Sequence, residues 1–392
     1  MTNDGNDYGK CALGLMSGTS GDGIDAALLW TDGERIDRIG ANITITYDVL
    51  FKDYIKKGIA RAKNHAEKTR HDATIQGLEE ELTRRHAQAV SALLKEAVLR
   101  PGDVDVIGFH GHTLDHRPDA GPGERLTWQI GDGALLAKLI GIDVVSDFRS
   151  ADMARGGQGA PLLPLYHAAI MRGLTTEDPV AVLNIGGVAN VTWIRFSSAP
   201  GDRGAGDKLR DEPEILAFDT GPGNALIDDW MQQRRGQPFD EGGALAATGS
   251  IDDSLLAGFL ADPFFAEPPP KSLDRAHFSF AALEGLSAAD GAATLTAFTA
   301  AVIQKAQDWM PVLPQVWYLA GGGRYNRTLV KGLEDRLEGR VAFIDEAGLE
   351  GDAIEAQGFA YLAVRSLRGL PLSLPGTTGV DAPCKGGVLH RA

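Results

Sequence analysis

A glycine-rich segment near the N-terminus has the residue types that bind a polyphosphate. Residues 14–25 read GLMSGTSGDGID and lie between two apolar runs, which predicts a strand, a tight turn and a second strand. The glycines let backbone N–H groups converge on an anion, and the hydroxyls of Ser17, Thr19 and Ser20 add donors. Asp22 and Asp25 supply the oxygen ligands that hydrated Mg²⁺ prefers. A plain surface hairpin is the alternative, but the whole string favours phosphate binding.

Two further glycine turns follow predicted strands, at Gly186-Gly187 and at 321–323. The chain has no GxxxxGK[ST] loop and no strand–GxGxxG–helix unit with an acidic residue after it. A bound nucleotide would therefore use neither of the two commonest phosphate loops. One such turn is usually structural. Three turns in two similar halves instead favour a site in which two turns bind the phosphates and the third contacts the nucleotide base.

Asp219 is the candidate for proton transfer. It follows the predicted strand 215–218 and precedes the turn TGPGN, which opens a predicted helix over 225–233. A carboxylate there is well placed to accept a proton from a substrate hydroxyl or from water. Aspartates at turns also simply accept backbone N–H groups, and the spacing leaves both roles open.

Arg149 is the candidate for binding an anionic substrate, through a two-pronged contact with a carboxylate. An ion pair within its own loop, with Asp147 or Asp152, is the alternative. His110, His112 and His116 are spaced like possible metal ligands, but no cysteine or glutamate cluster accompanies them, which favours a polar or structural role.

Two other features have weaker signals. The stiff segment 268–272 (PPPKS) could be a hinge or the edge of a lid, although a plain loop is the simpler interpretation. Glu355 lies on a predicted helix of small and apolar residues, where a lone acidic residue is unusual.

The composition is that of a globular protein with a large core. The chain has 392 residues, 43% hydrophobic residues and a formal charge of −15, which disfavours nucleic acid and anionic membranes as partners. Its cysteines, Cys11 and Cys384, are far apart, which fits a reducing compartment. The polar start is unlike a signal peptide, and no apolar run approaches the ~20 residues that span a bilayer. We therefore expect a cytoplasmic protein.

Alternating strands and helices predict an α/β fold. Strands are expected at 12–16, 25–30, 43–47, 104–109, 126–130, 142–145, 180–185, 190–196, 215–218 and 316–320. Helices are expected from 82 to about 97 and over 133–139, 225–233, 295–310 and 326–337. The strand–glycine turn–strand plan of 12–30 returns at 180–196, which indicates duplicated domains.

Ten short motifs, in order along nearly the whole chain, resemble the anhydro-N-acetylmuramic acid kinase family. They are 14–25 (GLMSGTSxDGxD), 110–113 (HGxT), 129–131 (QIG), 147–149 (DFR), 156–161 (GGQGAP), 184–187 (NIGG), 218–224 (FDxGPGN), 270–272 (PKS), 321–323 (GGG) and 377–379 (TTG). The set is very specific, although no single motif is.

The resemblance implies two actin-like (ribonuclease H-like) α/β lobes around a central ATP and substrate cleft. The first lobe would be residues 1–142, with about 370–392 packed back on it, and the second would be 143–369. The implied reaction uses ATP and Mg²⁺, opens the 1,6-anhydro bridge of 1,6-anhydro-N-acetylmuramic acid with water and phosphorylates O6. The products are N-acetylmuramic acid 6-phosphate and ADP, in peptidoglycan recycling, and the family also implies a homodimer.

The resemblance also implies roles for individual residues. Asp219 would activate water, with Glu355 assisting near the anhydro bridge. The nucleotide would be bound by Ser17, Gly18, Thr19, Ser20, Gly21, Asp22, Gly23, Ile24, Gly186, Gly187, Gly321, Gly322, Gly323 and Asn326, with Asp22 holding Mg²⁺ through water. The sugar would be bound by His110, Thr113, Gln129, Arg149, Gly221 and Asn224.

The sequence departs from the family pattern at a few positions. Gly21 stands where leucine is usual, His112 replaces a usual glutamine, and Ser150 and Ala151 stand where arginines are frequent. These changes bear on substrate preference more than on reaction type. The alternatives are a related actin-like sugar kinase with another acceptor and a non-catalytic ATP-binding regulator; the intact context of Asp219 disfavours the regulator.

Overall fold

The computed structural model describes residues 9–18, 23–69, 72–118, 120–121, 124–175, 177–196 and 212–392. The chain forms two compact units. The first comprises residues 1–173, 353–375 and 380–392, and the second comprises 174–352 and 376–379. The chain passes between them within α5 (Pro164–Leu174), between Asp352 and Ala353, and at α11 (Pro375–Thr378).

A mixed sheet forms the centre of the first unit, with strand order β12-β6-β4-β1-β2-β3 and β5 paired with β4. The strands are β1 (Lys10–Ser17), β2 (Gly23–Thr31), β3 (Ile36–Thr46), β4 (Val106–Arg117), β5 (Leu126–Ile130), β6 (Val144–Ser146) and β12 (Val388–His390). The first three strands are antiparallel neighbours, whereas β4 runs parallel to β1 and β6 runs parallel to β4. The central strands are apolar on both faces, as expected for a sheet covered on both sides.

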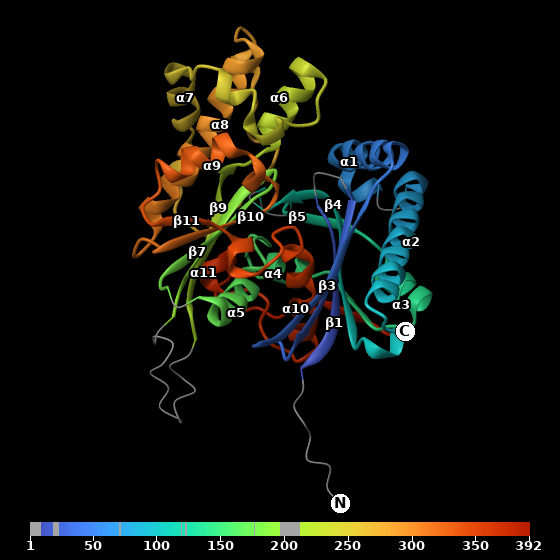
Figure 1. The fold of residues 1–392 in the computed structure, drawn as a ribbon. Coiled ribbons are helices and arrows are strands. Elements are labelled where there is room, and N and C mark those ends of the chain that lie inside the picture. The colour runs from blue at the N-terminus through green and yellow to red at the C-terminus, as the bar shows by residue number, and fades with distance from the viewer. Residues whose placement is uncertain are drawn as a thin grey trace, which may run out of the picture. The chain divides into compact units, whose positions relative to one another are not determined.

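Helices cover both faces of this sheet. The helices of the unit are α1 (Val49–Thr69), α2 (Ala73–Glu96), α3 (Gly133–Ile140), α4 (Ser150–Ala154), α5 and α10 (Ile354–Leu367). α1, α2 and α3 share one apolar core with the strands, and Figure 1 shows α10 on the opposite side of the sheet. α10 lies so close to β1 and β4 that a Cβ on Gly14 would stand 1.7 Å from the Ala356 carbonyl oxygen, and one on Gly108 would stand 2.0 Å from that of Phe359. Only glycine permits this approach.

The second unit contains a sheet of order β11-β10-β7-β8-β9. Its strands are β7 (Val180–Ile185), β8 (Val188–Arg195), β9 (Glu214–Pro222), β10 (Val316–Ala320) and β11 (Arg340–Phe343). β7, β8 and β9 are antiparallel neighbours, and β10 and β11 continue the sheet in parallel on the other side of β7.

Two apolar clusters stabilise the second unit. Its helices include α6 (Ala225–Arg235), α7 (Asp253–Leu260), α8 (Ala288–Lys305) and α9 (Arg327–Glu334). α8 and α9 pack on the sheet, while α6, α7 and the other face of α8 enclose a cluster around Trp230 and Phe298. Figure 1 shows α8 and α9 next to the strands, with α6 and α7 farther from them.

Both units therefore have one topology, in which three antiparallel strands are followed by parallel strands on the other side of the first. The expected α/β class with two lobes of the same plan is confirmed. The division differs from the expected boundary after residue 142: residues 143–173 and 353–369 belong to the first unit. The reason is long-range packing, because β6 pairs with β4 and α10 packs against β1.

Two strands are longer than the sequence predicts. The strand expected at 104–109 continues in β4 through His110, His112 and His116, and Gly111 within it has a φ of +74°. β9 continues to Pro222, so Asp219 lies within a strand and not at its end. In both cases a neighbouring strand, β5 or β8, supplies the pairing that prolongs the element.

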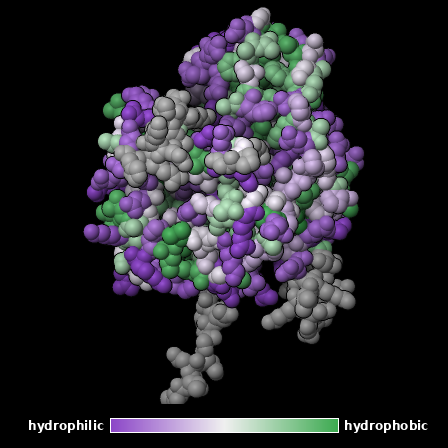
Figure 2. All heavy atoms as spheres, turned by 180° about the vertical axis from the view of Figure 1, so that it is seen from behind, coloured by the Kyte–Doolittle hydropathy of each residue, from purple (hydrophilic) through white to green (hydrophobic). Residues whose placement is uncertain are grey.

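Figure 2 shows a face on which hydrophilic residues predominate and hydrophobic ones form several separate groups. In the part of the chain that the structure describes, no helix has both the length and the apolar character needed to cross a bilayer.

Candidate active site

Three glycine-containing turns meet at one end of the second sheet. The turn between β7 and β8 contains Gly186 and Gly187, whose carbonyls accept the N–H groups of Asn224 (2.8 Å) and Gly223 (2.9 Å). The turn after β9 is thereby fixed against the β7–β8 turn. Asn224 also donates its side-chain amide to the Ile185 carbonyl at 3.2 Å.

The third turn, after β10, packs against the same residues. Gly321 has a φ of +75°, and a Cβ there would lie 2.4 Å from Oδ1 of Asn184. A Cβ on Gly323 would lie 2.2 Å from Cγ2 of Ile185, and one on Gly322 would have Nδ2 of Asn224 at 3.9 Å. The structure thus brings Gly186, Gly187, Asn224 and the 321–323 turn together, with their backbone groups close to one another.

Arg324 anchors the third turn. Its side chain is 4% exposed, and its Nη1 donates to the Gly321 carbonyl (3.0 Å) and to Oδ1 of Asp352 (2.7 Å). Nε donates to Asp345 at 3.1 Å, and Nη2 donates to the Tyr325 hydroxyl at 2.6 Å. Because these partners surround one rigid guanidinium, they fix the position of the turn.

Asn326 has a structural task beside this turn. Its Oδ1 accepts the Leu329 N–H at 3.0 Å and so caps the N-terminus of α9. The residue therefore fixes the start of the helix that follows the 321–323 turn.

Asp219 is fixed from two sides within β9. Its side chain is buried at 8% exposure, its N–H donates to the Lys271 carbonyl at 2.9 Å, and its Oδ2 accepts the Leu273 N–H at 2.8 Å. Asp219 pairs with Asn190 of β8, and Gly221 pairs with Ala189 two residues farther along β9. The carboxylate is therefore oriented on the strand that leads directly into the Gly221–Asn224 turn.

His110 and Arg149 form a bonded pair in the first unit. Arg149 Nε and Nη2 both donate to Nε2 of His110, at 3.1 and 3.0 Å, and Arg149 Nη1 donates to the Gly159 carbonyl at 2.6 Å. Nδ1 of His110 therefore carries the proton and donates to the Gly111 carbonyl at 3.0 Å. Burial, reinforced by the Arg149 charge, lowers the pKa of His110 well below its usual range, so the ring is neutral.

A row of polar side chains crosses from β4 to β5. Nε2 of Gln129 donates to the hydroxyls of Thr127 (2.9 Å) and Thr113 (3.2 Å). The Thr127 hydroxyl also contacts Nδ1 of His116 at 3.0 Å. Thr113 and Gln129 are register partners, so the strand pairing itself brings these two predicted residues together.

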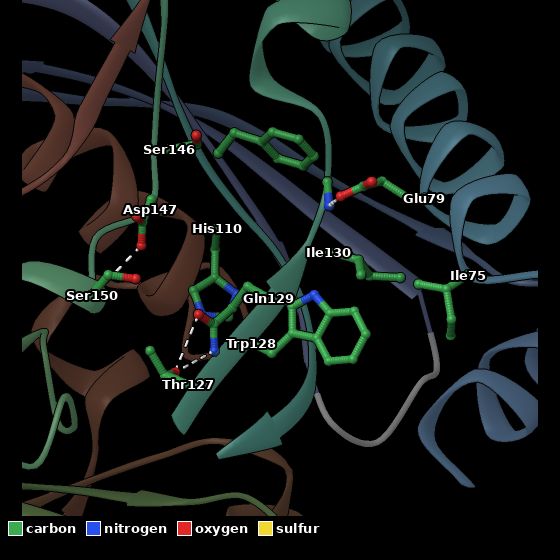
Figure 3. Close-up of a pocket in the computed structure, with 12 residues that line it drawn as sticks. Ile75, Glu79, His110, Thr127, Trp128, Gln129, Ile130, Ser146, Asp147 and Ser150 are labelled. Carbon is green, nitrogen blue, oxygen red and sulfur yellow. Dashed lines mark hydrogen bonds between the residues drawn. The ribbon is translucent and has the colours of Figure 1, made fainter. Parts of the chain in front are cut away.

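A cavity of about 310 Å³ opens beside this row, a size within the range of small-molecule sites. Figure 3 shows Gln129 and His110 on one side of it and Glu79 and Ile75, from α2, on the other. Its lining is Ile75, Glu79, Phe109, His110, Thr127, Trp128, Gln129, Ile130, Gly131, Ser146, Asp147 and Ser150. The mixture of aromatic and polar side chains fits a sugar better than a purely apolar ligand.

Glu355 lies in the first turn of α10. Phe359, four residues along and on the same helical face, packs its ring 4.6 Å from the His110 ring and 5.4 Å from that of Phe148. Helical geometry thus places Glu355 one turn from the residue that contacts the His110–Arg149 pair.

The N-terminal hairpin is described only at its base. Oγ of Ser17 is hydrogen-bonded to the Tyr47 hydroxyl (2.8 Å) and to Nδ1 of His112 (3.0 Å). Gly18, Gly23 and Ile24 flank the turn, whereas Thr19, Ser20, Gly21 and Asp22 lie outside the described residues. Asp25, at the start of β2, accepts a hydrogen bond from Thr44 at 2.6 Å.

The three histidines of β4 have separate partners: Arg149 for His110, Ser17 for His112 and Thr127 for His116. Within the described residues, no group of three or more His, Cys, Asp or Glu side chains is arranged to hold a metal ion.

Sequence reasoning missed Thr127, Glu79, Lys271 and Arg324. Thr127 could have been found from its alternation with Gln129 in a short strand. Lys271 belongs to the PKS motif at 270–272, but neither the motif nor the neighbouring prolines indicate a role for its side chain. Glu79 had no local signal because its partner, the Gly131 N–H, is distant in the sequence, and the acidic partners of Arg324, Asp345 and Asp352, are distant as well.

Comparison with known proteins identifies the family to which the chain belongs. The family model described as "Anhydro-N-acetylmuramic acid kinase" matches residues 10–392. An anhydro-N-acetylmuramic acid kinase of Rhizorhabdus wittichii is 51% identical over 380 residues, 97% of this chain and 98% of that protein. One of Rhodospirillum rubrum is 50% identical, with 97% of this chain and 94% of that protein covered. Among solved structures, the similarity to the Acidaminococcus fermentans (R)-2-hydroxyglutaryl-CoA dehydratase component A is distant, with a TM-score of 0.44 and 14% identity over 92% of this chain and 99% of that one.

Proposed function

The chain belongs to the anhydro-N-acetylmuramic acid kinase family and is an ATP-dependent phosphotransferase, and we propose that Asp219 is the base of its reaction. The observation that carries this role is the fixed carboxylate of Asp219 on the strand leading into the Gly221–Asn224 turn. A base whose orientation is set before substrate arrives loses little entropy at the moment of proton transfer.

In the proposed reaction, Asp219 accepts a proton from a water molecule whose oxygen bonds to C1 of the sugar. The bond from C1 to O6 breaks, and its electron pair remains on O6. O6 then bonds to the γ-phosphorus while the bond from phosphorus to the ADP oxygen breaks, so ADP leaves with that electron pair. The protein's work is positioning and charge stabilisation, as in phosphoryl transfer generally.

The glycine turns support the nucleotide part of this proposal. Gly186 and Gly187 would present backbone groups to the phosphates, and the turn at 321–323, with Asn326 behind it, would contact the adenosine. The hairpin around Ser17 would bind the β- and γ-phosphates. Ser17 supports this role because Tyr47 and His112 already orient its hydroxyl.

The polar groups of the first unit support the sugar part. Arg149 would bind the lactyl carboxylate of the substrate, and His110, whose ring nitrogens are both bonded, would act by orienting Arg149. Thr113 and Gln129 would contact sugar hydroxyl or amide groups, and Glu355 would assist at the anhydro bridge. Gly221 and Asn224 would shape the site beside Asp219.

Mg²⁺ fits the donors near the hairpin, because Asp25 offers a carboxylate of the kind that the ion prefers. Asp22 would hold the ion through water. When bound, Mg²⁺ would offset the negative charge of the triphosphate.

The proposal includes a homodimer in the cytoplasm. Two buried, free cysteines agree with a reducing compartment. Light scattering coupled to size-exclusion chromatography measures the dimer directly, and a monomeric mass at micromolar concentration contradicts it.

A labelling experiment tests the proposed reaction. The protein is incubated with ATP, Mg²⁺, 1,6-anhydro-N-acetylmuramic acid and ¹⁸O-water. The mass of the sugar product formed during turnover is then measured by mass spectrometry. The expected product carries phosphate on O6 and one ¹⁸O on C1. Phosphorylation of another sugar, with no turnover of this one, would favour a changed acceptor, and ATP binding without any turnover would favour a regulator.

A further inference from the structure

Lys271 has no part in the reaction as described, yet its side chain is 7% exposed. It stands at the end of the proline-rich segment that the sequence marks as stiff. A buried ammonium group is costly unless its donors are satisfied, so its partners indicate what it holds in place.

The ammonium group of Lys271 is hydrogen-bonded to the backbone of the segment that precedes it in the chain. Nζ donates to the carbonyls of Phe264 (2.7 Å) and Glu267 (2.9 Å). It also lies 4.5 Å from the ring centre of Phe264 and 5.6 Å from that of Trp309, so aromatic faces cover it. Phe264 belongs to the apolar cluster formed by α6, α7 and α8, which makes this anchor rigid.

The backbone around Lys271 holds Asp219. The Lys271 carbonyl accepts the Asp219 N–H at 2.9 Å, and the Leu273 N–H donates to Oδ2 of Asp219 at 2.8 Å. One residue therefore has its side chain tied to the loop anchor and its main chain tied to the proposed base. Any displacement of residues 271–273 changes the position of the carboxylate.

We propose that Lys271 is a positioning residue, whose ammonium group fixes segment 271–273 and through it the orientation of the Asp219 carboxylate. The inference rests on the proposed role of Asp219. The ammonium group of Lys271 is hydrogen-bonded to the Phe264 and Glu267 carbonyls, and the Lys271 main chain makes the bond to Asp219, so we expect the effect of Lys271 to pass through the main chain.

The surroundings of Lys271 disfavour its charged form, which agrees with an ammonium group that is kept buried as an anchor. Burial lowers the pKa of Lys271 from 10.5 to about 8, the Glu267 charge opposes this shift, and the Lys305 charge adds to it. The two carbonyls and the aromatic rings supply compensating contacts. A residue kept charged in such surroundings is well suited to holding one geometry.

The test compares Lys271→Met with Lys305→Met in the full-length protein. The first substitution removes the two Nζ donors but keeps an unbranched apolar side chain. The second removes a charge that acts on Lys271 while leaving the anchor intact. Lys271→Arg serves as the conservative variant, because it retains the charge and several donors.

We expect Lys271→Met to lower kcat at least tenfold, with the KM values for ATP and sugar changed less than twofold. The acid limb of the kcat/KM profile should move to higher pH, because a displaced Leu273 N–H no longer stabilises the carboxylate. Lys271→Arg should recover part of the loss, and Lys305→Met should match the wild type. A merely structural role would lower the amount of folded protein without moving the pH profile.

The outcomes distinguish a failure of the positioning role of Lys271 from a failure of the proposed base Asp219. If Asp219→Asn abolishes turnover while Lys271→Met leaves kcat and the acid limb unchanged, the positioning role is wrong and the base remains. If Asp219→Asn turns over normally, the proposed base fails. Should Lys271→Met not fold, Lys271→Arg decides alone, since an unchanged kcat and an unchanged acid limb in that variant overturn the inference.

Discussion

Arg149 directs two guanidinium nitrogens at one ring nitrogen of His110, at 3.1 and 3.0 Å. Such a contact requires a neutral histidine, and the Nδ1–H that remains is bound by the Gly111 carbonyl. The Phe359 ring packs against the imidazole, so His110 itself has little freedom. The pair therefore holds the positive charge of Arg149 in a fixed position beside the cavity.

The first prediction concerns Arg149. Arg149→Ala should raise the KM for the sugar at least tenfold, because a carboxylate loses a charge-assisted, two-pronged partner, while the KM for ATP should stay within twofold. Arg149→Lys should recover only part of the affinity, since an ammonium group lacks the planar fork. Arg155→Ala, an exposed neighbour, is the control. An unchanged sugar KM in Arg149→Ala would remove Arg149 from substrate binding.

The second prediction concerns Asp219. Asp219→Asn keeps the size of the side chain but removes the proton acceptor, so kcat should fall by about 10²–10⁴-fold. ATP affinity, measured by calorimetry, should change little because no charge near the phosphates is added. Asp229→Asn, at a half-exposed aspartate paired with Arg275, provides the matched control. Near-normal turnover in a folded Asp219→Asn protein would show that another group removes the proton.

The third prediction concerns acid stability. Burial lowers the pKa values of His86 and His112 to about 4 and that of His167 to about 3. The folded state resists protonation at these rings, whereas the unfolded chain binds protons near pH 6.5. The free energy of unfolding should therefore be highest above pH 6.5 and decrease as the pH falls from 6.5 toward 4, by up to about 1.4 kcal/mol per pH unit for each ring.

Urea unfolding at pH 7.5, 6 and 5 measures this dependence. His112→Gln should reduce the slope by about one proton, because glutamine can accept the Ser17 hydrogen bond without titrating. A slope identical to that of the wild type would mean that His112 is not protonated on unfolding in this range.

Local sequence predicted those elements that are made by uninterrupted apolar runs. The bounds 126–130, 180–185 and 316–320 match β5, β7 and β10, because apolar residues predominate in each strand and a glycine follows its last residue. The duplicated plan was visible for the same reason, since both halves begin with two apolar strands around a glycine turn. Candidate site residues at strand ends, such as Gly186 and Gly321, followed directly from these assignments.

The remainder depends on contacts that are distant in the sequence. The predicted strand ends at residue 109 because the segment with His110 and His112 is polar and contains glycine, but pairing with β5 prolongs the strand through it. The expected boundary at 142 separated Glu355 from the first unit, whereas α10 returns to β1 across more than 300 residues, where Gly14 admits it. The residue pattern of α10 does not indicate which sheet the helix covers.

The final prediction concerns Arg324, the residue that fixes the 321–323 turn. Arg324 joins the Gly321 carbonyl to Asp345 and Asp352, so it ties a turn of three glycines to two points of the following chain. Without it, glycine-rich backbone samples more conformations, and ordering it would then cost part of the nucleotide binding energy. Arg324→Met retains most of the apolar stem and should raise the KM for ATP about tenfold, with the KM for the sugar within twofold.

Two comparisons make this assignment specific. Arg327→Met, at an exposed arginine in the first turn of α9, should leave both KM values unchanged. Asp352→Asn should have a smaller effect than Arg324→Met, because Asp345 and the Gly321 carbonyl still hold the guanidinium. Equal losses of ATP and sugar affinity in Arg324→Met would instead indicate general loosening of the second unit, since a residue that fixes one turn acts only on the ligand that this turn contacts.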